Sequence, residues 1–351
     1  MYIYFIRTYY PHWAGHSGIH QFVRYLNPQN YKSETGLAFD GDDGFPIKNN
    51  VIRFCCRSIV QMQGMPWYKL SDLVAESKAI QKIWSHKVNI IHYLEGEHSA
   101  QYLPQLITLF GGNRPKLVAT YHQPPELLDS LINKQIVNQL DCITVVSPEQ
   151  LRYFTQFIAP DKVRLILHGI DTDYFKPACF PRDLTRFKCV TVGKHLRDYN
   201  LLRKVVEILS GDKDIEFHIV SSEASALQDL PNAKIYRGIS DPELLALYQQ
   251  SDVLLLPLIQ STANNALLEG IACGLPVIST NLPSVRTYLP DAAAILVQDH
   301  QPAAWVEAIL SLKNDLARRE LMGHATRKRA EELDWRNIYP FYEKIYSYLC
   351  S

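Results

Sequence analysis

The stretch Ser251-Asp-Val-Leu-Leu-Leu-Pro257, followed by Asn265-Ala-Leu-Leu-Glu-Gly-Ile-Ala-Cys-Gly-Leu-Pro-Val277, places a helical pattern between two short apolar runs. Four consecutive apolar residues that end at a proline are typical of a strand buried on both faces. A strand, a helix and a second strand in succession form a parallel βαβ unit. The stretch therefore predicts a parallel sheet with helices on its faces.

Similar strand-like runs recur along the whole chain, with helical patterns between them. In the first half they are Tyr2–Ile6, Val88–His92, Leu117–Tyr121, Cys142–Val146 and Val163–Leu167. In the second half they are Lys188–Val192, Glu216–Val220, Lys234–Tyr236, Val253–Leu256, Pro276–Ser279 and Ala294–Val297. This alternation is typical of doubly wound α/β domains.

The alternation is broken between Asp171 and Thr185, where polar residues accompany two prolines. We therefore predict two Rossmann-like domains, residues 1–170 and 171–334, followed by a C-terminal helix over residues 335–351 that crosses back. A capping box at Ser240-Asp-Pro-Glu243 predicts a helix start. The apolar face predicted for the C-terminal helix consists of Ile338, Phe341, Tyr342, Ile345 and Leu349.

Composition excludes several classes of protein. The chain has 351 residues, of which 47% are hydrophobic, so it can bury a full core and is not disordered. It carries 36 basic and 36 acidic residues. A net charge of zero disfavours nucleic-acid binding, because a nucleic-acid backbone is recognised by an excess of basic residues.

The seven cysteines lack the repeated CxxC spacing of structural zinc sites, which favours reduced thiols in the cytoplasm. No apolar run reaches the roughly 18 to 20 residues that cross a bilayer, so no transmembrane segment is expected. The start Met1–Arg7 has no basic leader and is interpreted as a strand rather than a signal peptide. Residues 1–170 carry 16 basic and 13 acidic residues, an excess too small to decide whether the protein is peripheral at a membrane.

Three stretches together resemble the retaining glycosyltransferases of family 4. They are His168-Gly-Ile-Asp-Thr-Asp-Tyr-Phe-Lys-Pro177, the segment from Tyr236-Arg-Gly-Ile-Ser240 to Pro257, and Asn265–Val277. The resemblance covers residues 163–349 well and residues 1–162 loosely. It implies the GT-B architecture, in which two Rossmann-like domains face a cleft, with a nucleoside diphosphate sugar on the second domain and the acceptor on the first.

The third stretch also suits a nucleotide on physical grounds. Asn264 and Asn265 favour a helix start, whose free N–H groups attract phosphate. Glu269 lies one turn later, where its carboxylate can accept hydrogen bonds from ribose hydroxyls. A lone helical glutamate more often faces solvent or pairs with a lysine, but an apolar run follows Glu269 and the resemblance places the donor here. We assign these three residues, with Ile239, to the donor site.

The sequence departs from the family pattern at several donor-site positions. Ser261 stands where the resemblance implies a glutamate for the donor sugar, and a hydroxyl lacks the charge to hold two sugar hydroxyls. Of the two cations implied after the first strand of the second domain, Lys194 takes one position, but Tyr199 takes the other and Arg197 is displaced by two residues. We expect Lys194 and Arg197 to share stabilisation of the leaving diphosphate; a solvated loop with ordinary surface charges is the alternative.

Two features of the first domain match the family more loosely. Gly15-His-Ser-Gly-Ile-His20 follows the first strand and resembles the family's glycine loop, with Ser17 in the first glycine position and Gly18 approaching the donor. His122 ends a strand at the edge where open α/β sheets bind ligands. A plain turn and a structural histidine are the alternatives. Closure of the cleft would bring His122 and Gly18 against the donor sugar.

No metal site is predicted. His16 and His20 are four residues apart but lack a third ligand at usable spacing. No Asp-x-Asp motif follows a strand, and the nearest rivals are Asp40-Gly-Asp-Asp43 and Asp171-Thr-Asp173. Glu95 and Glu97 follow a strand and are assigned to the acceptor side rather than to a glycosidase acid and base.

We therefore expect a cytoplasmic or peripheral, metal-independent, retaining glycosyltransferase without a cofactor. It would move a sugar from a nucleoside diphosphate sugar to a hydroxyl of a glycan, lipid or small-molecule acceptor, with His122, Lys194 and Arg197 in catalysis. Two alternatives stay open: a non-catalytic GT-B binding or scaffold subunit with a degraded donor site, and a nucleotide-sugar epimerase.

Overall fold

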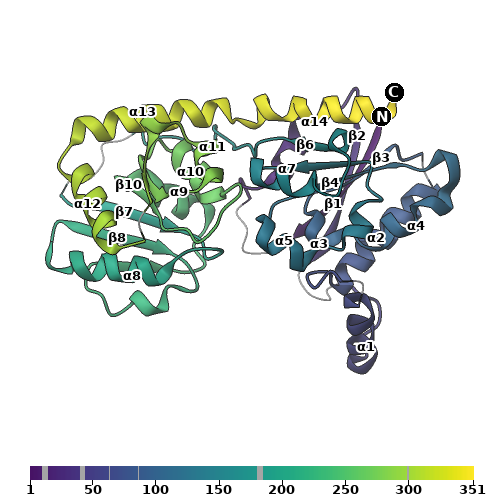
Figure 1. Ribbon diagram of the computed structural model, residues 1–351, viewed down its shortest axis with the longest axis horizontal. Helices are drawn as coiled ribbons and strands as arrows, with labels where there is room; N and C mark the ends of the chain where they lie inside the picture. Colours follow the sequence, from purple (N-terminus) through teal and green to yellow (C-terminus); the bar gives the residue numbers. More distant parts are fainter. Residues whose placement is uncertain (10–14, 40–43, 63, 86, 180–184, 299) are drawn as a thin grey trace. The chain divides into compact units, whose positions relative to one another are not determined.

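The computed structural model describes residues 1–9, 15–39, 44–62, 64–85, 87–179, 185–298 and 300–351 (Figure 1). The chain divides into two compact units. The first unit comprises Met1–Trp13, Ile19–His168 and Ile338–Ser351, and the second comprises Ala14–Gly18 and Gly169–Asn337. Each unit holds one parallel sheet with helices around it, so the predicted α/β class is confirmed.

The sheet of the first unit has the strand order β2-β1-β3-β4-β5-β6. Its strands are β1 Tyr2–Tyr9, β2 Lys32–Phe39, β3 Ile90–Tyr93, β4 Lys116–Tyr121, β5 Cys142–Val145 and β6 Val163–Leu165. The α-helices of this unit are α1 Asn50–Gln61, α2 Leu70–Ser85, α3 Gly96–Ser99, α4 Tyr102–Leu106, α5 Pro125–Leu131, α6 Lys134–Val137 and α7 Pro148–Phe154. Short 3₁₀ segments cover Ile19–Tyr25, Ile107–Asn113 and Pro160–Lys162.

Strand β2 was not predicted from the sequence. It lies at the edge of the sheet and begins with Lys32, Ser33 and Glu34, none of which is buried. Such a strand lacks the apolar run by which central strands are identified. Its Gly36 lies so close to the ring of Tyr4 on β1 that a Cβ atom there would collide with it. The pairing of β2 with β1 therefore requires a residue without a side chain at position 36.

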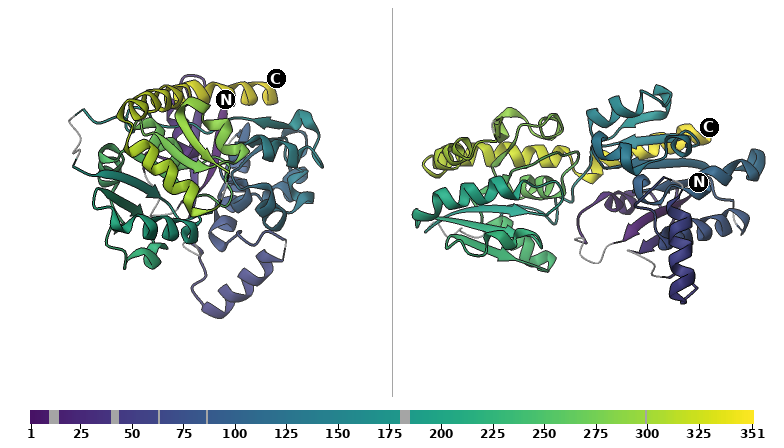
Figure 2. Two further views of the ribbon diagram at one scale, coloured as in Figure 1. Left: turned by 60° about the vertical axis from the view of Figure 1, so that its left-hand side comes forward. Right: turned by 60° about the horizontal axis from the view of Figure 1, so that its bottom comes forward.

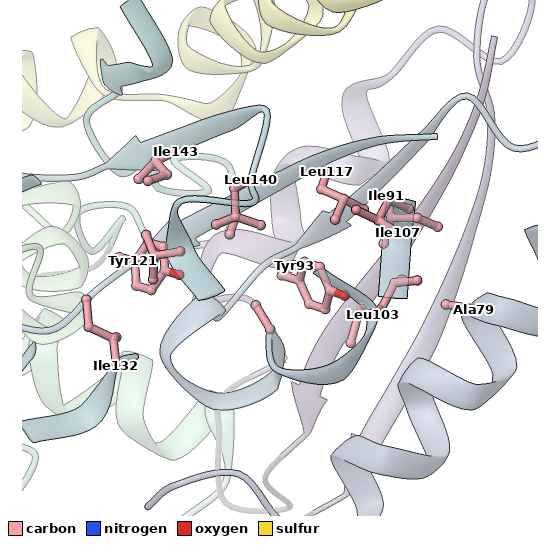
Figure 3. Close-up of a cluster of buried hydrophobic side chains, with 14 of the residues drawn as sticks. Ala79, Ile91, Tyr93, Leu103, Ile107, Leu117, Tyr121, Ile132, Leu140 and Ile143 are labelled. Atoms are coloured by element: carbon pink, nitrogen blue, oxygen red, sulfur yellow. The ribbon is translucent and has the colours of Figure 1, made fainter. Parts of the chain in front are cut away.

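The core of the first unit lies between the sheet and its helices (Figure 3). Ile91 and Tyr93 of β3 pack with Leu117 of β4 and with Leu103 of α4, and all four side chains are fully buried. Successive side chains of a strand alternate between the two faces of the sheet. Residues 91 and 93 therefore share the face that this cluster covers.

The sheet of the second unit has the order β12-β11-β10-β7-β8-β9. Its strands are β7 Phe187–Val192, β8 Ile215–Val220, β9 Ala233–Tyr236, β10 Val253–Leu256, β11 Val277–Thr280 and β12 Ala294–Val297. Its α-helices are α8 Tyr199–Ile208, α9 Asp241–Gln250, α10 Asn265–Ala272, α11 Pro283–Tyr288, α12 Pro302–Lys313 and α13 Leu316–Glu332 (Figure 2). Short 3₁₀ segments cover Leu209–Gly211, Ala224–Leu227 and Asp291–Ala293.

Strand β10 shows why its sequence is wholly apolar. Val253 and Leu255 join the core cluster formed with α8 and α12. Leu254 faces the other side, where a Cβ on Gly270 of α10 would come within 2.6 Å of its Cδ2 atom. Both faces of the strand are covered, so no position in it faces water.

Two predicted helix features are confirmed, and one residue needs correction. Glu243 accepts hydrogen bonds of 2.7 Å from the backbone N–H and the hydroxyl of Ser240, which closes the capping box of α9. The last helix, α14, spans Trp335–Cys350 and joins the first unit from Ile338 onward. Its Phe341 is exposed, contrary to prediction. The buried face of the helix is instead formed around Tyr342 and the fully buried Tyr346, and Phe341 lies outside it.

The described residues contain no helix that is both long enough and apolar enough to cross a bilayer.

Candidate functional site

The second unit brings together two loops at the carboxyl ends of the adjacent strands β7 and β10. The Asp198 N–H donates to the Pro257 carbonyl at 2.9 Å, and the Ile259 N–H donates to the Leu196 carbonyl at 2.9 Å. Parallel α/β sheets bind ligands at this edge. The pairing holds the loop that carries Lys194 and Arg197 beside the residues that lead into α10.

The loop after β7 contains two residues in the left-handed region. Gly193 has a φ of 91°, and a Cβ atom there would lie 3.2 Å from Nη2 of Arg197. Leu196 has a φ of 57°, which costs a non-glycine residue roughly 1 to 2 kcal/mol. Such strain persists only where the surrounding contacts hold it, as the hydrogen bond to Ile259 does here.

Arg197 is held by protein acceptors. Its Nη2 donates to the Val192 carbonyl at 2.9 Å and to Oδ1 of Asn264 at 3.0 Å, and its Nη1 donates to the His195 carbonyl at 3.0 Å. Burial lowers the pKa of Arg197 to about 10, still well above neutral pH. The guanidinium therefore braces the loop and brings a positive charge to the start of α10.

Lys194 lies on the same loop, but its side chain is exposed to solvent rather than held by protein acceptors as Arg197 is. Its side chain is exposed, and its Nζ lies 4.0 Å from Glu223, which is the limit of an ion pair. Tyr199, which stands where the resemblance implied a lysine, donates its hydroxyl to the Gly193 carbonyl at 2.6 Å. The structure therefore gives Tyr199 a part in fixing the turn, while Lys194 carries an ammonium group that solvent can reach.

The other predicted donor residues lie around the start of α10 and after β9. Asn264 is the N-cap, and its Oδ1 accepts from the Leu267 N–H at 3.2 Å. Asn265 is the exposed first residue of the helix. Ser261 is half-buried and donates to the Thr262 carbonyl at 3.2 Å. Ile239 is half-buried on the loop between β9 and α9.

Glu269 neither faces solvent nor pairs with a lysine. It is 4% exposed, and its Oε2 accepts a hydrogen bond of 2.7 Å from the Tyr248 hydroxyl of α9. Its Oε1 accepts from the Ser17 hydroxyl. Burial raises the pKa of Glu269, while the two hydroxyl donors act in the opposite direction. The carboxylate is therefore buried among hydroxyl donors.

Residues 15–18 belong to the second unit although they follow β1 in the sequence. The Gly15 N–H donates to Oδ2 of Asp241 at 2.6 Å. The His16 ring stacks on Tyr174, and its Nδ1 lies 3.4 Å from Asp171. Gly18 has a φ of 99°, which favours glycine. The predicted glycine loop thus reaches the Glu269 carboxylate through Ser17.

Sequence reasoning missed two of the residues around Glu269. Tyr248 is 21 positions away along the chain, at the end of the helix whose start was predicted. Asp241 was noted only as part of the capping box. A tyrosine among the apolar residues of a short helix looks like part of the core, so the sequence pattern carried no signal for this contact.

The first unit holds the acceptor-side residues that the sequence predicted. His122 follows β4, and its Nε2 lies 2.8 Å from the Leu94 carbonyl after β3. Because a carbonyl only accepts, Nε2 carries the proton of the neutral ring. Burial lowers the pKa of His122 to about 4, so the ring is neutral at physiological pH.

Glu97 lies beside His122, and Glu95 lies two residues before Glu97 in the chain. Glu97 Oε1 accepts a hydrogen bond from the His122 backbone N–H at 3.1 Å. Glu95 accepts from the Thr8 N–H at 2.9 Å. Burial raises the pKa of Glu95 to about 8 and that of Glu97 to about 7. Both carboxyl groups therefore retain protons further toward neutral pH than exposed glutamates do.

Within the described ranges, no three or more His, Cys, Asp or Glu side chains gather as metal ligands would. Asp171 instead accepts the backbone N–H groups of Asp173 and Tyr174, each at 3.1 Å. The other rival motif, Asp40–Asp43, lies outside the described residues.

Both halves of the chain are similar to known families. Residues 19–174 match the model described as Glycosyltransferase Family 4, and residues 186–315 match the one described as Glycosyl transferases group 1. A D-inositol 3-phosphate glycosyltransferase of Paenarthrobacter aurescens is 31% identical over 144 residues, 40% of this chain and 34% of that protein. One of Corynebacterium diphtheriae is 24% identical over 247 residues, 62% of this chain and 58% of that protein. The matches thus span one third to somewhat over one half of these relatives.

Solved structures confirm the predicted GT-B fold. A sucrose-phosphate synthase from Thermosynechococcus elongatus has a TM-score of 0.72 at 17% identity, covering 99% of this chain and 98% of that one. Anabaena HepE in complex with UDP-glucose has a TM-score of 0.71 at 12% identity, covering 99% of this chain and all of that one. At these identities the likeness concerns the fold alone.

Proposed function

Because the two halves of this chain belong to glycosyltransferase family 4 and to the group 1 glycosyl transferases, we propose that it transfers a sugar from a nucleoside diphosphate sugar to a hydroxyl acceptor. The nucleotide binds the second unit, and the acceptor binds the first. The proposed reaction proceeds with retention at the anomeric carbon, without a metal ion or a cofactor, in the cytoplasm. The last point is supported by seven cysteines that are all free.

The observation that carries the proposal is the environment of Glu269. Each of its two oxygens accepts a hydrogen bond from a hydroxyl, one of Ser17 and one of Tyr248. The 2′- and 3′-hydroxyls of a ribose are donors of the same chemical class. Tyr248 is a buried helical residue, whereas Ser17 lies on a loop, so a ribose hydroxyl would replace Ser17 at Oε1.

The diphosphate would then lie over the start of α10, where helix N–H groups and cations stabilise negative charge. Lys194 is the solvent-accessible cation that would contact it, and Arg197 supports the same region through Asn264. When the bond between the anomeric carbon and the diphosphate breaks, the leaving group gains charge that Lys194 opposes. The acceptor oxygen bonds to the anomeric carbon on the same face, and its proton passes to the leaving diphosphate.

In this proposal His122 contacts the sugar or the acceptor as a neutral ring. Its Nε2 donates a hydrogen bond to the Leu94 carbonyl, which fixes the orientation of the ring. A neutral imidazole avoids placing a positive charge beside a sugar centre that itself becomes electron-poor during transfer. The low pKa of His122 supports this role.

A thermal-shift screen tests the proposal. UDP, GDP, ADP and CMP are added separately, since a ligand that binds only the folded protein raises its melting temperature. We expect one nucleotide diphosphate to stabilise the wild type and to lose this effect with Glu269→Gln. Sugar donors of that base are then incubated with candidate acceptors, and products are identified by mass spectrometry.

The outcomes separate the alternatives. A donor that is converted without any acceptor would indicate an epimerase. A protein that no nucleotide or nucleotide sugar stabilises would contradict the proposed transfer and leave a binding or scaffold subunit.

A further inference from the structure

The side-chain amide of Asn264, the N-cap of α10, is buried, but only its oxygen has partners. The residue is 7% exposed. Its Oδ1 accepts two hydrogen bonds, one of 3.0 Å from Nη2 of Arg197 and one of 3.2 Å from the Leu267 N–H. Its Nδ2 donates to no residue that the structure describes. A buried amide that leaves both N–H donors unused requires a partner from outside the chain.

The two hydrogen bonds fix the direction in which this amide faces. Only the oxygen of an amide accepts hydrogen bonds from N–H groups. Exchanging the two ends of the Asn264 amide would turn its NH₂ group toward the donors of Arg197 and Leu267. Nδ2 therefore points away from both donors, and protein contacts hold it in that orientation.

The start of α10 leaves further donors unused. Asn264 takes the Leu267 N–H with its side chain and the Leu268 N–H with its carbonyl, the latter at 3.0 Å. The backbone N–H groups of Asn265 and Ala266 donate to no described acceptor, as is usual in the first turn of a helix. Such N–H groups attract anions. Two backbone donors and the Asn264 amide thus remain for a ligand at one helix start.

Arg197 adds positive charge here but has little capacity to bind a ligand itself. Each of its three guanidinium nitrogens donates to the protein, and the acceptors are two backbone carbonyls and Oδ1 of Asn264. All of these acceptors are neutral, so they do not cancel its charge. The one acid of α10, Glu269, is engaged by the two hydroxyls described above. The helix start therefore favours an anion.

We propose that Asn264 donates from Nδ2 to the diphosphate of the sugar donor and that Arg197 is a positioning residue, which acts by orienting this amide. The proposal rests on the proposed function, because that function places the diphosphate over the start of α10. A diphosphate suits the site because its several oxygens can accept from the Asn264 amide and from the two backbone donors together.

Calorimetry with inorganic pyrophosphate tests the contact without any sugar transfer. The decisive variant is Asn264→Asp. Its carboxylate can still cap α10 and accept from Arg197, so the melting temperature should be unchanged or higher. The carboxylate has no N–H donor and repels an anion, so pyrophosphate binding should weaken about tenfold or more. Asn49→Asp, the same change at the N-cap of α1 in the first unit, is the matched control and should bind as the wild type does.

A double-mutant cycle tests the part of Arg197. Arg197→Ala should weaken pyrophosphate binding in the wild type but have little further effect once Asn264→Ala is present, because its effect passes through that amide. Arg197→Lys keeps a cation and a donor for Oδ1 of Asn264, so it should restore part of the lost affinity. Circular dichroism shows whether each variant is folded at the temperature of the titration.

Each contrary result has a separate meaning. Asn264→Asp that binds pyrophosphate as well as the wild type does would overturn the contact from Nδ2, since a residue that only caps the helix tolerates this change. A wild type without measurable affinity for pyrophosphate would overturn the anion site itself. Equal effects of Arg197→Ala with and without Asn264→Ala would overturn its positioning role. Normal pyrophosphate binding by a protein that transfers no sugar would contradict the proposed function alone.

Discussion

The hydroxyl of Tyr248 donates a hydrogen bond of 2.7 Å to Oε2 of Glu269, and both side chains are buried. The tyrosine lies in the last turn of α9 and the glutamate in the middle of α10, so the contact joins two consecutive helices of the second unit. A buried carboxylate without donors would be costly. The hydrogen bond from Tyr248 therefore supports the structure and also holds the Glu269 carboxylate that we propose binds the nucleotide.

Removing this donor should destabilise the protein. Tyr248→Phe keeps the ring but leaves a buried carboxylate with one hydrogen bond fewer, which typically costs about 1 to 3 kcal/mol. Urea denaturation measures the loss, with the exposed Tyr348→Phe as the matched control. A stability equal to that of the control would show that the hydrogen bond contributes nothing net.

Nucleotide binding should depend on Glu269. Glu269→Ala removes a charged acceptor for the ribose hydroxyls, and a loss of about 1.5 to 3 kcal/mol lowers affinity roughly tenfold or more. Calorimetry with the nucleotide found in the screen measures this, and circular dichroism confirms the fold. Asp173→Ala, which changes an exposed acid elsewhere in the second unit, should bind as the wild type does. Unchanged affinity in Glu269→Ala would place the ribose elsewhere.

Lys194→Ala and Arg197→Ala should both lower turnover, but only Arg197→Ala should lower the stability of the protein. Lys194→Ala removes an exposed ammonium and should leave the melting temperature unchanged, while kcat falls more than KM rises. Arg197→Ala also removes hydrogen bonds to three acceptors and should lower both kcat and stability. If both cations act on one diphosphate, the double variant loses less turnover than the product of the single effects. Normal turnover in Lys194→Ala would contradict its assignment.

Transfer should continue in EDTA. The proposed stabilisation of the diphosphate uses Lys194 and the start of α10 rather than a divalent cation. Initial rates are compared with EDTA, with added Mg²⁺ and with added Mn²⁺. A rate that vanishes with the chelator and returns with either metal would refute a metal-independent mechanism.

Stability should fall as the pH rises through the range in which the buried glutamates of the first unit ionise. The ordinary pKa of Glu97 is 4.5, and burial raises it to about 7. Between these values the unfolded chain has lost a proton that the folded chain keeps, so the contribution present below pH 4.5 disappears as the pH approaches and passes 7. Glu97→Gln should therefore stabilise the protein more at pH 8 than at pH 4.5 in urea titrations. The exposed Glu126→Gln is the control, and an equal response of the two variants would show that Glu97 is not responsible.

Much of the fold could be predicted from the sequence because the decisive signals are local. Central strands such as β10 are covered on both faces and therefore appear as continuous apolar runs, and Ser240 and Glu243 specify a helix start within four residues. Strand β2 escaped prediction because an edge strand exposes polar side chains. Phe341 was misplaced because nearly equivalent aromatic residues surround the packed face of α14.

The sequence by itself also determined which residue types are present at the proposed donor site, since Asn264, Asn265 and Glu269 lie within one local helical segment. It did not determine their partners. Tyr248, Ser17 and Arg197 reach this segment through hydrogen bonds that span 21, 252 and 67 positions. Such contacts follow from how strands are ordered in the sheet and how loops pair, and no periodicity along the chain encodes them. Tertiary structure alone therefore decided that Glu269 is buried among hydroxyls and that Arg197 holds its loop through hydrogen bonds.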